Sequence, residues 1–122
     1  MGRVLIVEDD ESVRTFTARA LQADGHTTET AGDGDEALEM IRARPGAFDL
    51  VLSDIRMPVM DGIAMAKAAA KAFPGLRILL MTGYAEQRER AAELDGLVLG
   101  VVRKPFSLAE IRSEVARALT QA

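Results

Sequence analysis

Short apolar runs alternate along this chain with segments whose apolar residues recur roughly every three or four positions. A short run that is apolar at every position and ends at polar or turn residues is typical of a strand buried on both faces of a parallel sheet. The other spacing is typical of helices that pack one side against a sheet. The pattern therefore predicts strands at residues 3–7, 48–53, 76–81 and 97–102. The alternation of strands and helices adds a fifth, weak strand at residues 26–31, whose sequence is HTTETA.

Five helices are expected between and after these strands, at residues 12–24, 33–41, 62–73 and 85–94 and from residue 107 onward. Pro74 and Gly75 close the third of them, and Ser107 with Glu110 has the S-x-x-E spacing of a capping box at the start of the last. The helix at 85–94 has the weakest apolar face, which consists of alanines and Leu94.

The strict alternation of strands and helices indicates the α/β class. Parallel strands need helical crossovers, and these crossovers are right-handed, so helices are expected on both faces of a doubly wound parallel sheet. A chain of 122 residues, 48% of them hydrophobic, fits one compact domain with one core. We therefore expect residues 1–122 to form a single domain.

Charge and composition exclude several classes of function. Fifteen basic residues stand against 19 acidic ones, for a net charge of −4, and the basic residues are scattered, which argues against direct binding of nucleic acid. The chain has no cysteine, so disulfides, thiolate zinc sites and thiol catalysis are excluded. Without a signal peptide or a long apolar segment, we expect a cytoplasmic protein that does not associate with membranes.

Polar side chains that can carry chemistry follow four of the five predicted strands. Glu8 and Asp9 come after the first strand, Asp54 after the third, Thr82 after the fourth and Lys104 after the fifth. Doubly wound sheets bind their ligands outside the carboxyl ends of the strands, where the strand order reverses. We expect these groups to converge on one crevice.

The residue types in this crevice indicate phosphoryl transfer. Carboxylates a few ångströms apart repel one another and require a cation or protons, and Mg²⁺ suits a set of oxygen ligands that also meets a phosphate. Asp9 and Asp54 are the expected direct ligands, with Glu8 acting through water. Lys104 supplies an ammonium and Thr82 a hydroxyl to the phosphoryl oxygens, while Asp54 is the nucleophile.

Each of these features also has a purely structural interpretation. An acidic run before a helix complements the helix dipole, and an Asp at the end of a strand is often a cap or a turn former. Thr-Gly after a strand is an ordinary turn, and Lys-Pro-Phe is an ordinary entry into a helix. The structural interpretation is favoured for each feature alone, whereas their combination at four strand ends favours a functional site.

The segments "VEDDE", "SDIRMPVMDG", "LLMTGY" and "VVRKPFS" together resemble the CheY-like receiver domain of bacterial two-component response regulators. The resemblance extends from end to end of the chain and implies a flavodoxin-like sheet of strand order 2-1-3-4-5 with five helices. It also implies a receiver domain without an output domain. Such a domain is a phosphoacceptor protein that assists its own phosphorylation and dephosphorylation rather than an enzyme.

The resemblance assigns roles to the residues at the strand ends. It implies that Asp54 is the phosphoacceptor, Glu8 and Asp9 the acidic pair that holds Mg²⁺, Thr82 the switch hydroxyl and Lys104 the phosphate-binding lysine.

Further roles implied by the resemblance concern the loops. The backbone carbonyl of Arg56 is expected to bind Mg²⁺, Pro58 and Gly62 to shape the loop after the third strand, and the Lys104–Pro105 peptide bond to be cis.

The chain departs from the family pattern at the switch positions. Many receivers carry an aromatic residue where this chain has Val101, and Thr82 is followed here by Gly83 and Tyr84. We expect Tyr84 to take the role of the missing aromatic. In the family, the positions of Arg56 and Tyr84 tune the attack of water on the acyl phosphate.

The implied partners are a histidine kinase or histidine phosphotransferase as the phosphoryl donor, and a separate protein that receives the signal. The segments "MTGYAEQRERA" and "KPFSLAEI" also resemble the CpdR-type single-domain receivers, which control the delivery of substrates to the ClpXP protease.

Other functions remain open from the residues alone. A pseudo-receiver would keep the fold as an interaction module without phosphorylation. A Mg²⁺-dependent phosphohydrolase of the haloacid dehalogenase type would need an acid/base Asp where the chain has Arg56, and a flavodoxin-like cofactor binder would need a hydroxyl-rich loop after the first strand. His26, the single histidine, is expected to be a solvent-exposed loop residue rather than a relay histidine.

Overall fold

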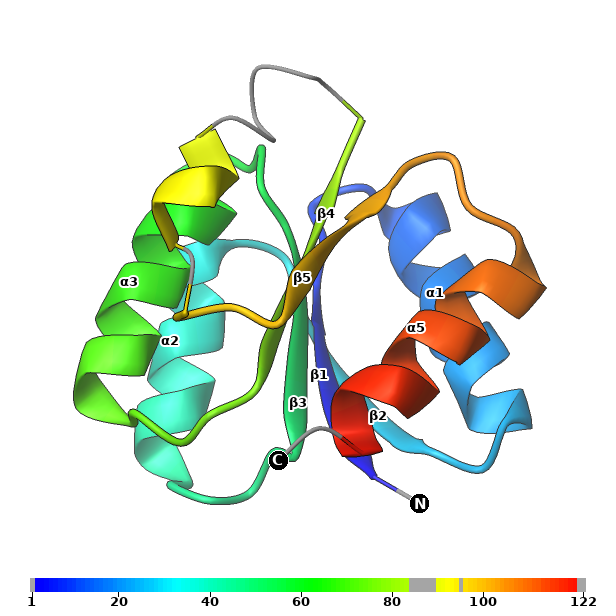
Figure 1. The fold of residues 1–122 in the computed structure, drawn as a ribbon, viewed down its shortest axis with the longest axis horizontal. Coiled ribbons are helices and arrows are strands. Elements are labelled where there is room, and N and C mark those ends of the chain that lie inside the picture. The colour runs from blue at the N-terminus through cyan, green and yellow to red at the C-terminus, as the bar shows by residue number, and fades with distance from the viewer. Residues whose placement is uncertain (1, 84–89, 95, 121–122) are drawn as a thin grey trace.

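The computed structural model describes residues 2–83, 90–94 and 96–120, which form a five-stranded sheet with helices on both sides (Figure 1). The strand order is β2-β1-β3-β4-β5, and every neighbouring pair is parallel. The expected flavodoxin-like α/β class and strand order are thereby confirmed. The strands are β1 (Arg3–Val7), β2 (Thr27–Ala31), β3 (Leu50–Asp54), β4 (Ile78–Thr82) and β5 (Gly100–Arg103).

Four α-helices cover the two faces of the sheet in the described residues. Helices α1 and α5 lie on one face and α2 and α3 on the other (Figure 1). The helices are α1 (Glu11–Ala23), α2 (Gly34–Ala43), α3 (Gly62–Ala72) and α5 (Leu108–Thr120).

The expectation of five helices is corrected to four within this described part of the chain. Half of the helix expected at 85–94, residues 85–89, lies outside the described residues. In its described half, residues 90–91 are helical and the 3-10 helix η1 (Ala92–Leu94) follows them. Its apolar face was the weakest of the five, because alanines bury little surface.

Two strands begin later than their apolar runs, because turns use the first backbone amides of those runs. The amide of Leu76 donates to the carbonyl of Phe73 (3.0 Å), which closes the turn after α3. The amide of Leu97 likewise donates to the carbonyl of Leu94 (2.7 Å) after η1. An amide bonded within a turn cannot join the sheet ladder, so β4 starts at Ile78 and β5 at Gly100.

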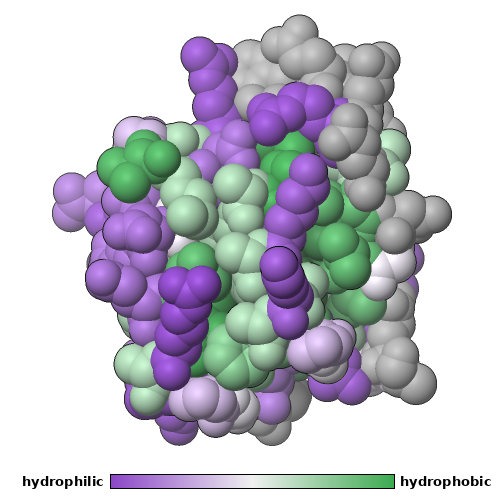
Figure 2. All heavy atoms as spheres, turned by 90° about the vertical axis from the view of Figure 1, so that its left-hand side faces the viewer, coloured by the Kyte–Doolittle hydropathy of each residue, from purple (hydrophilic) through white to green (hydrophobic). Residues whose placement is uncertain are grey.

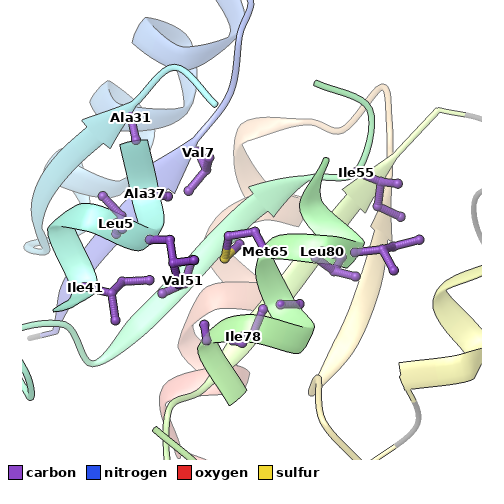
Figure 3. Close-up of a cluster of buried hydrophobic side chains, with 14 of the residues drawn as sticks. Leu5, Val7, Ala31, Ala37, Ile41, Val51, Ile55, Met65, Ile78 and Leu80 are labelled. Atoms are coloured by element: carbon purple, nitrogen blue, oxygen red, sulfur yellow. The ribbon is translucent and has the colours of Figure 1, made fainter. Parts of the chain in front are cut away.

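The core consists of one apolar cluster on each face of the sheet. Successive strand residues point to opposite faces, so Leu5 and Val7 face α2 and α3, whereas Val4 and Ile6 face α1 and α5. Figure 3 shows the α2–α3 side, where Leu80 and neighbouring side chains interdigitate. Each fully buried aliphatic side chain contributes about 1.5–3 kcal/mol, so this double burial explains why β1, β3 and β4 are largely apolar. The edge strand β2 is only partly buried and has the polar sequence TTETA.

The outer surface of the α2–α3 side mixes hydrophilic residues with weakly hydrophobic ones (Figure 2). The sequence of α3, GIAMAKAAAKA, accounts for part of this surface, because alanine is small and helix-favouring and the lysines are polar. Buried alanines at positions 66, 69 and 70 allow α3 to lie close to the sheet. In the part of the chain that the structure describes, no helix has both the length and the apolar character required to cross a lipid bilayer.

His26 is buried, and the expectation that it is a solvent-exposed loop residue is wrong. The side chain is only 6% exposed, and its Nδ1 accepts a hydrogen bond from the amide of Gly2 (3.2 Å). The amide of Thr27 also donates to the carbonyl of Gly2 (3.0 Å), so the start of the chain lies along the start of β2. The backbone of Gly2 thereby contacts both the imidazole and β2, a contact between distant segments that local sequence does not indicate.

The loop between β3 and α3 is anchored by Asp61. Its Oδ1 accepts from the amide of Ala64 (2.8 Å) and caps α3, and its Oδ2 pairs with the guanidinium of Arg90 (2.9 Å). Burial acts to raise the pKa of Asp61, but these hydrogen bonds outweigh it and hold the pKa below its ordinary value of 3.8. The same loop contains Val59, which has a φ of 67° and is 84% exposed.

We expect Asp61→Ala to lower the free energy of unfolding by about 1 kcal/mol at neutral pH, because it removes the helix cap. Asp61→Asn retains a capping oxygen and should lose less. The folded-state pKa of Asp61 is lowered, so its stabilisation is complete above pH 3.8 and is lost as the pH falls through the folded-state value. Urea denaturation should therefore show the gap between wild type and Asp61→Asn closing in acid; a gap independent of pH would contradict this assignment.

We expect Val59→Asn to raise the free energy of unfolding by about 1 kcal/mol. A β-branched residue is strained at positive φ, whereas asparagine enters this region readily, and the exposed valine side chain contributes little burial. Chemical denaturation measures the change. Val59→Ala is the matched control, since it shortens the side chain without the tendency of asparagine to adopt positive φ. Its free energy of unfolding should rise less than that of Val59→Asn.

Candidate functional site

Three charged side chains meet at the carboxyl ends of β1, β3 and β5. Glu8 follows β1, Asp54 is the last residue of β3, and Lys104 follows β5. The strands are parallel, so these ends lie on one edge of the sheet and open into a pocket of ≈ 920 Å³. Described residues that line this pocket from several elements include Glu8, Asp9, Asp10, Val13, Phe16, Asp54, Arg56, Gly83, Lys104, Pro105 and Phe106.

Lys104 bridges the two buried carboxylates. Its Nζ donates to Oε1 of Glu8 (2.8 Å) and to Oδ2 of Asp54 (3.0 Å). Glu8 is 1% exposed and Asp54 8% exposed, so these interactions are little screened by water. One ammonium faces two carboxyl groups, so ionising both of them would leave an excess of negative charge.

The position of the Asp54 carboxylate is determined by groups on several sides. The amide of Ile55 donates to its Oδ1 (2.9 Å), while Oδ2 meets Lys104. The hydroxyl of Ser53 donates to the Asp54 backbone carbonyl (2.9 Å). A Cβ added at Gly62 would lie 2.1 Å from that carbonyl oxygen, so only glycine lets α3 begin this close to the end of β3.

The electrostatics of the site favour binding of positive charge. Burial raises the pKa of Glu8 to about 8, and the neighbouring Asp54 carboxylate acts in the same direction, although Lys104 acts in the opposite one. Burial acts to lower the pKa of Lys104, but its contacts with Glu8 and Asp54 outweigh burial and raise that pKa. The lysine is therefore firmly charged, and the raised pKa of Glu8 means that a proton neutralises much of the remaining negative charge near neutral pH, in the place that a bound cation could take.

The acidic residues fit a hard divalent cation. Oxygen atoms of Glu8, Asp9 and Asp54, one from each, all lie within 4.8 Å of one another. Oε2 of Glu8 is buried and makes no hydrogen bond with any described residue, which leaves an oxygen ready for a further partner. Mg²⁺ prefers oxygen ligands and commonly binds through one or two carboxylates with several waters, so the donor set suits it.

Thr82 and Gly83, at the carboxyl end of β4, lie beside the acidic cluster. Thr82 is the last residue of β4 and is buried, and its carbonyl accepts from the amide of Lys104 (2.8 Å). Gly83 lines the pocket, and Tyr84 lies outside the described residues. Val101 is half-buried in β5, opposite Leu80, and packs against the apolar cluster beneath α2 and α3.

The predicted loop residues lie on two sides of the pocket. Arg56 is exposed and lines the pocket, and Pro58 is exposed in the loop leading to α3. The peptide bond between Lys104 and Pro105 is cis. The structure thus brings Glu8, Asp9, Asp54, Arg56, Gly83, Lys104 and Pro105 to one pocket.

Some contacts of the site were not predicted from the sequence. The guanidinium of Arg14 donates from Nη1 to the backbone carbonyl of Glu8 (2.9 Å). The rings of Phe16 and Phe106, whose centroids are 6.5 Å apart, form an apolar rim. An arginine or a phenylalanine on an amphipathic helix has no distinctive sequence signal, so only the packing of α1 reveals these contacts.

Comparison with known proteins identifies similar chains. The family model of the response regulator receiver domain matches residues 4–116. The response regulator receiver protein CpdR of Brucella abortus (strain 2308) is 36% identical over 125 residues, and the match covers 100% of both chains. The sensor kinase CckA of the same organism is 37% identical over 116 residues, which cover 95% of this chain and 12% of that protein.

A solved structure shows the same fold. The crystal structure of the response regulator protein TrrA from Thermotoga maritima, in complex with Mg²⁺-BeF, superimposes with a TM-score of 0.87 at 30% identity. The superposition covers 97% of this chain and 99% of that one.

We expect Asp54→Asn to stabilise the cation-free protein by on the order of 1 kcal/mol, because it removes repulsion between buried carboxylates while Glu8 retains Lys104. Mg²⁺ should then stabilise the variant less than it stabilises the wild type. Thermal unfolding with a chelator and with added Mg²⁺ measures both effects. Asp35→Asn removes the same charge from an exposed site in the first turn of α2, so it should lose a little stability to the helix dipole and leave the effect of Mg²⁺ unchanged. An unstable cation-free Asp54→Asn would refute the repulsion argument.

Proposed function

The chain belongs to the response regulator receiver domain family, and we propose that it is a phosphorylation-dependent signalling switch whose phosphoacceptor is Asp54. As a receiver domain of a two-component response regulator, it would take its phosphoryl group from a phosphohistidine on a histidine kinase or histidine phosphotransferase. The observation that carries this proposal is the position of the Asp54 carboxylate, buried at the base of the pocket with Lys104 at 3.0 Å.

The proposed reaction is an in-line transfer to the Asp54 carboxylate. A carboxylate oxygen forms a bond to phosphorus as the bond between phosphorus and the histidine nitrogen breaks. The imidazole leaves with the electron pair of that bond and takes up a proton, and Asp54 becomes an acyl phosphate. The buried carboxylate is an effective nucleophile because its orientation is fixed by the Ile55 amide before the phosphoryl group arrives.

Other residues of the chain stabilise the charge of the transferred group. Lys104 is close enough to Asp54 to exchange its contact with the carboxylate for one with a phosphoryl oxygen. The hydroxyl of Thr82 is proposed to donate a hydrogen bond to another phosphoryl oxygen.

We further propose that Asp9, Asp54 and the backbone carbonyl of Arg56 hold Mg²⁺, with Glu8 acting through water. A bound Mg²⁺ would neutralise negative charge on the carboxylates and the phosphoryl oxygens. The clustered carboxylate oxygens and the Mg²⁺-BeF complex of TrrA support this assignment.

The switch is proposed to pass from the pocket to the surface through Thr82. In this proposal Thr82 and Gly83 move toward the phosphoryl group, and Tyr84 takes the role of the aromatic switch residue that is missing at Val101. Arg56 and Tyr84 would tune the attack of water on the acyl phosphate. Pro58, Gly62 and Pro105 are assigned the structural role of holding the surrounding loops.

The signal is proposed to reach a separate protein in the cytoplasm. The similarity to the response regulator receiver protein CpdR supports the resemblance to CpdR-type receivers, and that resemblance extends the proposal to ClpXP-dependent proteolysis as the output. Two rivals make different predictions: a pseudo-receiver would not be phosphorylated, and a phosphohydrolase would turn over free phosphate esters.

Intact mass spectrometry after incubation with acetyl phosphate tests the proposal. We expect the wild-type protein to gain one phosphoryl group only when Mg²⁺ is present, and we expect alkali to remove it, because acyl phosphates hydrolyse in base. Asp54→Asn should gain none.

Asp35→Asn serves as the matched control, because it removes an exposed carboxylate outside the pocket and should be labelled like the wild type. A folded wild-type protein that stays unlabelled with acetyl phosphate and with a phosphorylated histidine phosphotransferase would establish the pseudo-receiver instead. Labelling that persists in Asp54→Asn would assign the phosphoacceptor to another residue.

A further inference from the structure

Arg14 contacts the backbone of the acidic pair from the neighbouring helix. It lies in α1, is half-buried, and donates from Nη1 to the carbonyl oxygen of Glu8 (2.9 Å). Glu8 follows the last residue of β1, so its carbonyl has left the regular strand. A guanidinium remains charged at all physiological pH values, and a hydrogen bond from it is stronger than one between neutral groups.

This contact completes the restraint of the Glu8 backbone. The amide of Glu8 donates to the carbonyl of Ala31 in β2 (3.0 Å), and the carbonyl of Glu8 accepts from Arg14. With both polar backbone groups held, the backbone from which the Glu8 side chain enters the pocket is restrained. Asp9, the next residue, shares the peptide unit that Arg14 holds, so the contact restrains both members of the acidic pair.

Arg14 is not needed to build the helix that carries it. Helix α1 is capped by Asp10, whose side chain accepts from the amide of Val13 (3.0 Å). The helix is fixed to the sheet by buried side chains on its other positions, Thr17, Ala18, Ala20 and Leu21. The guanidinium therefore acts mainly on the turn between β1 and α1 rather than on the packing of α1.

We infer that Arg14 is a positioning residue for cation binding: it holds the Glu8–Asp9 peptide so that both carboxylates face Asp54. This inference rests on the proposed function, because it assigns a purpose to the acidic pair. Arg14 contacts the backbone carbonyl and acts on the cation only through Glu8 and Asp9. Residues that orient metal ligands commonly change metal affinity when they are substituted, even though they do not touch the metal.

The test is the Mg²⁺ concentration that gives half of the maximal rise in melting temperature of the unphosphorylated protein. We expect Arg14→Gln to require about tenfold more Mg²⁺ than the wild type. Arg14→Lys retains a charged donor and should fall between the two. Arg19→Gln is the matched control, since Arg19 lies on the same helix but lines the pocket between α1 and α5, and it should match the wild type.

A second readout separates positioning from a general loss of structure. Labelling of Arg14→Gln by acetyl phosphate should be slow at limiting Mg²⁺ and return to the wild-type rate at saturating Mg²⁺. A merely destabilised protein would lower the melting temperature in chelator without moving the Mg²⁺ midpoint, and that outcome would overturn the inference. A rate that stays low at saturating Mg²⁺ with an unchanged midpoint would also overturn it.

Two further outcomes distinguish misfolding of the variant and failure of the proposed function from failure of this inference. If Arg14→Gln does not fold, Arg14→Lys takes its place, and a wild-type Mg²⁺ midpoint in that variant overturns the inference. Failure of the proposed function is a separate result, because it appears as a wild-type protein that is not labelled on Asp54. A wild-type protein whose melting temperature does not respond to Mg²⁺ would overturn the cation site and the role of Arg14 together.

Discussion

A single ammonium group, that of Lys104, is shared by two buried carboxylates, and the rest of the site depends on this shortage of positive charge. Glu8 and Asp54 are almost inaccessible to water, so neither can be stabilised by hydration. Lys104 joins them, but the carboxylate of Asp9 is nearby and one oxygen of Glu8 has no described partner. The arrangement is stable enough to fold, yet it leaves binding capacity for an incoming cation and for a group whose oxygens Lys104 can contact.

The parallel sheet is what makes this concentration of charge possible. In a parallel sheet the carboxyl ends of neighbouring strands meet on one edge, so residues distant in sequence, such as Glu8 and Lys104, can be placed within hydrogen-bond distance. Apolar clusters on both faces hold the strands in register. The two apolar clusters therefore stabilise the fold enough to tolerate a destabilising group of like charges at the edge of the sheet. Functional sites commonly lower stability in this way.

The loop between β3 and α3 also combines a strained backbone with contacts that stabilise it. Val59 holds a left-handed conformation that a β-branched residue seldom adopts, in the loop that follows Asp54. At the other end of that loop, Gly62 is required because α3 begins against the Asp54 carbonyl. Asp61 counteracts this strain by capping α3 and pairing with Arg90. Local strain persists where surrounding contacts determine the backbone.

The sequence by itself determined the class of fold, the approximate location of the strands and the residue types at their carboxyl ends. Burial on both faces of a sheet requires apolar runs, and these runs are visible in the order of the residues. The tertiary structure decided the starts of β4 and β5, where turn hydrogen bonds withdraw amides from the sheet. It also decided the burial of His26, which accepts a hydrogen bond from the amide of Gly2, and the contact of Arg14 with the Glu8 carbonyl. The spacing of apolar residues along a sequence indicates which face of a helix or strand is buried. The contacts of His26 and Arg14 join distant segments instead, and they exist only once the elements have packed.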